Sequence, residues 1–70
     1  GPVPGEVALG IYDPGGRLRR ELARGVLPAG RHGFIWDGRD DAGALCASGV
    51  YLARVSAGKM EGRCKLVLLK

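Results

Sequence analysis

Seventy residues are enough for one small domain with a thin core, because a chain of this size buries only about 60% of its unfolded surface on folding. Apolar residues make up 46% of the chain, which excludes a disordered segment, and no apolar run approaches the ~20 residues of a transmembrane helix. The 13 glycines and 4 prolines are spread between the apolar residues, so the composition predicts short strands joined by tight turns.

The net charge of +4 raises the question of a nucleic-acid site, because four arginines cluster near residue 20. No aromatic residues interleave with this cluster, and Asp13 and Glu21 flank it. These features favour a solvated strand face over nucleic-acid binding. The clustered residues are Arg17, Arg19, Arg20 and Arg24.

The domain is expected to cover residues 3–70, since Gly1-Pro2 resembles the scar left by a tag-removing protease. Its first predicted strand covers residues 7–12, where one face is apolar at every second position. Residues 13–16, Asp-Pro-Gly-Gly, then form a turn, because Pro fixes φ and Gly accepts positive φ.

The second predicted strand covers residues 17–22 and directs Leu18 and Leu22 inward. Strict alternation directs Arg20 to the same side. A charged side chain on an inward position predicts a β-bulge there or an edge position for this strand.

A turn within residues 25–30 precedes a third predicted strand at 31–36. Its inward side chains are predicted to be His32, Phe34 and Trp36, because the opposite register would expose the large aromatics.

The rest of the chain predicts one short extended piece and two further strands, which makes about six antiparallel strands in all. This pattern is typical of a small all-β, Ig-like or fibronectin-like sandwich. The elements are a loop at 37–43, the short piece at Leu45-Cys46, a strand at 50–56, a hairpin loop at 57–62 and a last strand at 63–69.

Several motifs occur in order along residues 6–69, and together they resemble the FlgD-type immunoglobulin-like domain. That family is named for the flagellar hook-capping protein, and similar domains sort cargo for type IX secretion. The motifs are Val7 to Asp13, Gly16-Arg17-Leu18-Arg19 with Leu22, Ala29-Gly30-Arg31-His32, Trp36-Asp37-Gly38-Arg39-Asp40 with Gly43, Ser48-Gly49-Val50-Tyr51, and the basic-apolar ending Lys65 to Lys70.

The resemblance implies a non-catalytic C-terminal accessory module of an exported bacterial protein, secreted or at the cell surface. Such a module would serve secretion, surface attachment or assembly through contacts with a protein partner or its parent catalytic domain. The alternatives are the Ig-like domain of the hook-capping protein itself, or a carbohydrate- or calcium-binding accessory module. We expect no cofactor, no nucleic-acid partner and no membrane insertion.

This sequence departs from the family at two places. The family's preceding strand is missing before residue 6, so either a strand lies outside this sequence or one sheet edge is open to self-association. In addition, Cys46 stands where the family usually has a β-branched residue. Cys46 and Cys64 could form one disulfide bridge, or they could be two small buried hydrophobic residues.

The best candidate for chemistry is the loop at 37–43, whose carboxylates Asp37, Asp40 and Asp41 could supply oxygen ligands to calcium. Turn stabilisation is favoured instead, because Asp side chains accept hydrogen bonds from backbone N–H groups in tight turns. The resemblance likewise implies a structural loop, with Gly38 and Gly43 at its bends.

The remaining candidates are also expected to be structural. Trp36 and Tyr51 could form a carbohydrate-stacking platform, but with only four aromatic residues the core needs both. Gly49 marks the turn before the strand of Tyr51. His32 is the only histidine and lies within a strand pattern, so catalysis with a cysteine is not expected.

Overall fold

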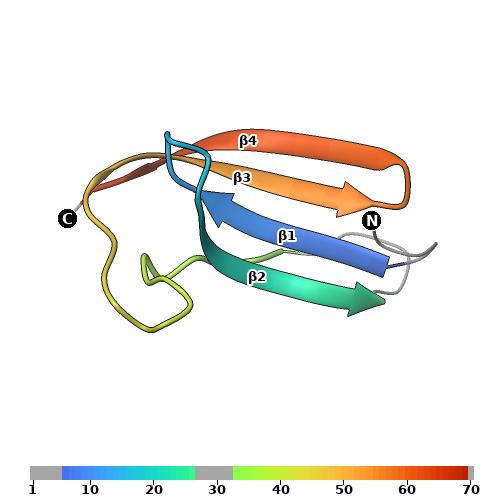
Figure 1. The fold of residues 1–70 in the computed structure, drawn as a ribbon, viewed down its shortest axis with the longest axis horizontal. Helices are drawn as coiled ribbons and strands as arrows, with labels where there is room; N and C mark the ends of the chain where they lie inside the picture. Colours follow the sequence, from blue (N-terminus) through green and yellow to red (C-terminus); the bar gives the residue numbers. More distant parts are fainter. Residues whose placement is uncertain (1–5, 27–32, 70) are drawn as a thin grey trace.

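Four antiparallel strands form a single twisted sheet in the computed structural model, which describes residues 6–26 and 33–69 (Figure 1). No helix among the described residues is long and apolar enough to cross a membrane. The sheet order is β2-β1-β3-β4, so β1 and β3 are central and β2 and β4 are the edges. The strands are β1 (Glu6–Tyr12), β2 (Leu18–Val26), β3 (Gly49–Ala57) and β4 (Met60–Leu68).

The turn between β1 and β2 is held mainly by Asp13. The Asp13 carbonyl accepts a hydrogen bond from Gly16 N (2.9 Å), and the Asp13 carboxylate accepts one from Arg17 N (2.9 Å). Gly16 has a φ of +87°, a conformation that favours glycine. The Asp-Pro-Gly-Gly sequence therefore forms the predicted turn.

The pairing of β1 with β2 is irregular on both sides of Arg20. Ile11 lies opposite Arg20, while Arg19 and Leu22 have no residue opposite them because the register shifts twice. These shifts are β-bulges, and β2 is an edge strand. Arg20 thus lies on the same face as Ile11, on a bulged edge strand, as predicted. The prediction that Leu18 points inward is wrong, because the register shift at Arg19 places Leu18 opposite Tyr12 on the other face, where it is 46% exposed.

The hairpin between β3 and β4 is tighter than the predicted loop at 57–62. Ala57 pairs directly with Met60, so only Gly58 and Lys59 form the turn. Gly58 has a φ of +61°, and glycine at the first central position permits a two-residue hairpin turn that matches the twist of its strands. The prediction placed too many residues in the loop because it gave weight to every glycine, including Gly62, which lies within β4.

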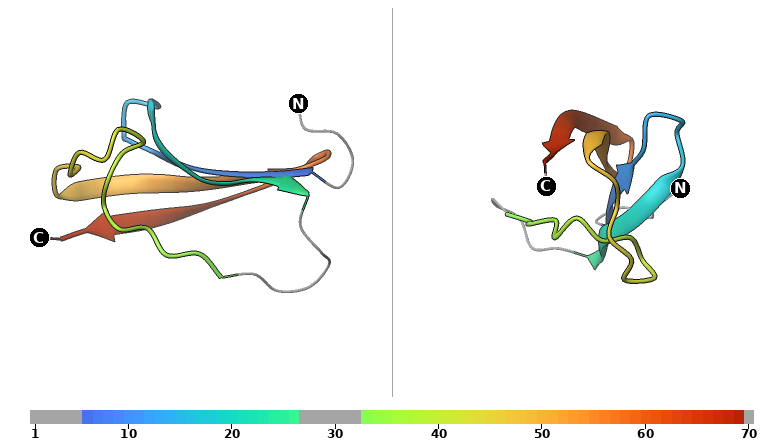
Figure 2. Two further views of the ribbon diagram at one scale, coloured as in Figure 1. Left: turned by 90° about the horizontal axis from the view of Figure 1, so that it is seen from below. Right: turned by 90° about the vertical axis from the view of Figure 1, so that its left-hand side faces the viewer.

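The prediction of six strands is not confirmed, because residues 33–48 contain no strand and only an isolated bridge between Arg39 and Leu45. Of the predicted strand at 31–36, residues 33–36 are irregular, and His32 lies outside the described residues. A strand forms only where it can pair along an edge of a sheet, and these residues pair with neither edge strand. Residues 33–47 instead run along one face of the sheet (Figure 2), which we call the inner face.

The core is small and lies between the inner face and this covering segment. Ile11 (1% exposed), Cys46 and Tyr51 are buried, and five partly buried residues pack against them. Phe34 and Trp36 line a cavity of about 310 Å³ over the inner face, whereas Ile35 between them is 93% exposed. Alternation therefore predicted the side on which Phe34 and Trp36 lie, although the segment is not a strand and Phe34 is still 43% exposed. The five packing residues are Leu22, Trp36, Ala53, Leu66 and Leu68.

Candidate functional site

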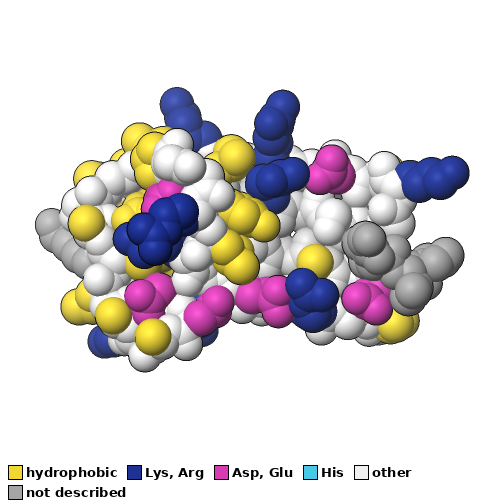
Figure 3. Space-filling model, viewed as in Figure 1, with side chains coloured by type: hydrophobic (Ala, Val, Ile, Leu, Met, Phe, Trp, Pro, Cys, Tyr) yellow, Lys and Arg dark blue, Asp and Glu magenta, His cyan; other side chains and the backbone are white. Residues whose placement is uncertain are grey.

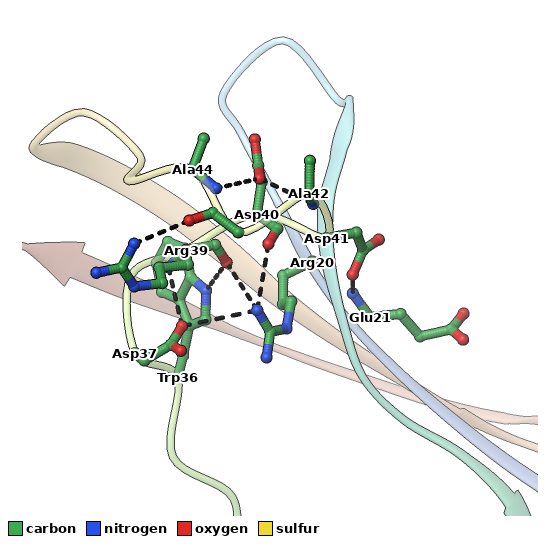
Figure 4. A network of polar contacts seen from close by, with 10 residues as sticks. Arg20, Glu21, Trp36, Asp37, Arg39, Asp40, Asp41, Ala42 and Ala44 are labelled. Atoms are coloured by element: carbon green, nitrogen blue, oxygen red, sulfur yellow. Dashed lines mark hydrogen bonds and ion pairs between the residues drawn. The ribbon is translucent and has the colours of Figure 1, made fainter.

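The acidic loop predicted as the best site for chemistry is a network of hydrogen bonds between carboxylates and backbone N–H groups (Figure 4). Asp37 accepts a hydrogen bond from Arg39 N (3.0 Å). Asp40 accepts from both Ala42 N (3.0 Å) and Ala44 N (2.9 Å). These are the contacts of a carboxylate that stabilises a tight turn.

Asp41 makes a different contact, because it reaches the edge strand β2 rather than its own loop. Its backbone N donates to Arg19 O (2.9 Å), and its carboxylate accepts from Glu21 N (3.0 Å). Asp41 thus pairs with two backbone groups of an edge strand as a neighbouring strand would. Nothing in the sequence signalled this contact, since 20 residues separate Glu21 from Asp41.

Arg20 joins the inner face of β2 to the same loop. Its guanidinium donates to Asp40 O (3.2 Å) and Arg39 O (3.5 Å), and it lies 3.8 Å from the Asp37 carboxylate. The indole of Trp36 also donates to Arg39 O (2.9 Å). The inward position of Arg20 is therefore explained by the carbonyl groups of the covering segment that accept its hydrogen bonds. In the sequence, the only sign of this contact was that a charged residue stood at an inward position of the alternating pattern.

The three aspartates do not converge on one point that a cation could occupy. Among the described residues there is no group of three His, Cys, Asp or Glu residues that could hold a metal ion. One oxygen of each aspartate is already used by a backbone N–H group, so the geometry supports turn stabilisation.

We expect that millimolar calcium leaves the melting temperature of the domain unchanged, because a ligand stabilises only the state that binds it. Differential scanning fluorimetry with a calcium series, and magnesium as the control cation, measures this. A melting temperature that rises with calcium in the wild type but not in Asp40→Asn contradicts the structural interpretation.

Trp36 and Tyr51 pack against each other rather than forming a flat platform. Their ring centroids are 5.0 Å apart with an interplanar angle of 71°, an edge-to-face arrangement. Tyr51 is only 6% exposed, so its face is not open for sugar stacking. Its hydroxyl donates to Ala47 O (2.6 Å), four residues upstream and just before β3.

Tyr51→Phe is expected to lower the free energy of unfolding by about 1 kcal/mol, since one partly buried hydrogen bond is lost and the ring is kept. Urea unfolding followed by Trp36 fluorescence measures this change. Tyr12→Phe is the matched control, because no hydrogen bond of the Tyr12 hydroxyl is present among the described residues. Equal losses for both variants contradict a special role for Tyr51.

The two cysteines are free in the structure. Cys46 is buried in the core beside Ile11 and Tyr51, as expected of a small hydrophobic residue. Cys64 is exposed on β4, opposite Ala53. The bridge considered from the sequence is not formed, because one thiol is packed in the core while the other faces solvent.

The arginine cluster is largely balanced by nearby carboxylates. Glu21 accepts hydrogen bonds from Arg24 Nε to both of its oxygens (3.1 and 3.0 Å), and this contact raises the pKa of the Arg24 guanidinium. Arg24 therefore stays charged throughout the physiological range. The other ion pairs of the cluster are Arg19 with Asp13 (3.4 Å) and Arg20 with Asp37 (3.8 Å).

The antiparallel sheet and the hydrogen bond of Tyr51 define the class of domain. A tyrosine near the start of a strand whose hydroxyl bonds to the backbone a few residues upstream is the tyrosine corner of immunoglobulin-like domains. The family model of the FlgD Ig-like domain matches residues 4–61, so the chain belongs to this family. Comparison with curated proteins and with solved structures gave no match.

Proposed function

We propose that this domain is a non-catalytic protein-contact module related to the Ig-like domain of the flagellar hook-capping protein. The observation that carries the proposal is the family match over residues 4–61. The surface is suited to contacts with another protein, because the edge strand β4 and several large apolar side chains are exposed. In this role the domain would support the ordered assembly of hook subunits.

Sedimentation velocity of the domain with purified hook subunits tests this proposal. We expect a saturable complex with the hook subunit and none with flagellin from the same bacterium, which is the control for general stickiness. A domain that sediments independently of hook subunits at all concentrations contradicts the hook-cap function.

The second candidate is an accessory module that serves export or surface attachment of a larger bacterial protein. It is favoured by the basic-apolar run at Lys65 to Leu69, which resembles the ending of the family and lies largely on the exposed edge strand β4. A reporter enzyme fused to the domain separates the candidates. Export that requires the domain, without hook-subunit binding, supports the accessory role.

A further inference from the structure

We propose that the free edge of β4 is a docking edge for one extended strand of another protein, with acidic side chains on one face of that strand and apolar side chains on the other. The proposal rests on the protein-contact function above and specifies its surface and the chemistry of its partner. It follows from the difference between the two sheet edges and from the charges along β4.

Among the described residues, the edge of β4 is open along its whole length, whereas the edge of β2 is occupied near its start. β4 pairs with β3 on one side over nine residues, and no described residue pairs with its other side. The edge of β2 is different, because Asp41 occupies the outward backbone groups of Arg19 and Glu21. An open edge presents unpaired N–H and C=O groups, which an added strand satisfies.

One face of β4 carries uncompensated positive charge. Arg63 lies opposite Arg54, and Lys65 lies opposite Leu52, on the outer face of the sheet. Arg54 is paired with Glu61 (3.0 Å) and also lies over the Tyr12 ring, whereas Arg63 and Lys65 make no ion pair among the described residues. Figure 3 shows Lys and Arg side chains along the β4 side of this face with an acidic side chain beside them, whereas acidic and basic side chains are interspersed on the β2 side.

The local shape leaves room beside Arg63 for a side chain of an added strand on this face. A cavity of about 230 Å³ lies beside Arg63, with Gly62, Arg54 and Glu61 as its other walls. On the opposite face, β4 presents Cys64 and Leu66, and Leu66 lines the apolar cavity of the inner face. A strand that alternates acidic and apolar residues therefore complements both faces.

A second copy of this chain fits the edge less well. Symmetric antiparallel pairing centred on Arg63 or Lys65 places that residue opposite itself, and pairing centred on Cys64 places Arg63 opposite Lys65. Like charges directly opposite each other destabilise a strand pair. Moving the centre to Gly62 or to Leu66 avoids this opposition but leaves only five residues of β4 paired, Met60 to Cys64 or Cys64 to Leu68. The charge pattern thus favours an acidic partner.

The probe is a capped peptide of alternating Glu and Val, matched in length to the nine residues of β4. Fluorescence anisotropy measures its binding to the wild type and to Arg63→Glu/Lys65→Glu. We expect the double variant to bind this peptide at least about tenfold more weakly and to prefer a Lys and Val peptide. Arg17→Glu/Arg24→Glu is the control, because it changes the net charge equally but on the β2 side. A cooperative thermal unfolding transition shows that each variant is folded.

Three results overturn the proposal. The first is equal binding of the Glu and Val peptide by the β4 variant and the wild type. The second is that the wild type binds an N-methylated form of this peptide, which cannot donate backbone hydrogen bonds from either edge, as tightly as the unmethylated form. The third is no binding by the wild type, including the case in which sedimentation shows that a second copy takes the edge. If hook subunits still bind in that third case, the edge proposal fails while the proposed function stands.

Discussion

Replacing Ile11 with alanine is expected to lower the free energy of unfolding by about 2–5 kcal/mol, through lost burial and the cavity left behind. Ile11 is the most deeply buried side chain of the described residues (1% exposed), and it lies on the central strand β1. A domain of this size has little stability in reserve, so most of the variant should be unfolded at 37 °C. Urea unfolding followed by circular dichroism measures the loss.

Ile35→Ala is the matched control for this experiment, because the same atoms are removed from a side chain that is 93% exposed. We expect a change within about 0.5 kcal/mol for this variant. Similar losses at both positions would show that the small cluster around Ile11 is not what holds the sheet and its covering segment together.

Gly38→Ala is expected to destabilise the domain by about 1–3 kcal/mol for two separate reasons. Gly38 has a φ of +79°, where an alanine is strained, and it is buried. A Cβ atom at this position would also lie 3.3 Å from Leu68 Cδ1 of β4. The change therefore strains the loop and presses it against the sheet.

Gly43→Ala separates the two causes, because Gly43 has a similar φ of +88° but a Cβ there meets nothing within 4 Å. We expect this variant to lose only the backbone component, about 1 kcal/mol. Thermal unfolding of the two variants in parallel measures the difference between their losses of stability, which is the contribution of the contact with Leu68. If both variants lose the same free energy of unfolding, the Leu68 side chain moves aside without penalty and its contact with the loop does not contribute to the destabilisation.

Local features of the fold could be predicted from the sequence. The alternation in residues 7–12 predicted β1, and the Asp-Pro-Gly-Gly turn after it is formed. The alternation also placed Phe34 on the inner side, where it lines the apolar cavity. Each of these features depends on a few neighbouring residues, so a short stretch of sequence contains the information.

The rest depends on contacts between distant residues. Residues 33–36 have an alternating pattern but lie over a face of the sheet and pair with neither of its edges, and an alternating pattern alone does not show where a segment will lie. The contact of Asp41 with β2 depends on where the loop crosses the sheet. The sequence could predict that the aspartates of the acidic loop stabilise a turn. It could not predict which N–H groups donate to Asp40 and Asp41, because these depend on how the loop is folded and placed.

The contact of Asp41 with β2 also limits how large an assembly this domain can build. A sheet that is open at both edges can add strands without end, as in a fibril. Asp41 occupies the start of the β2 edge, so a strand added there meets backbone groups that are already bonded, and the docking proposed at β4 predicts a one-to-one complex.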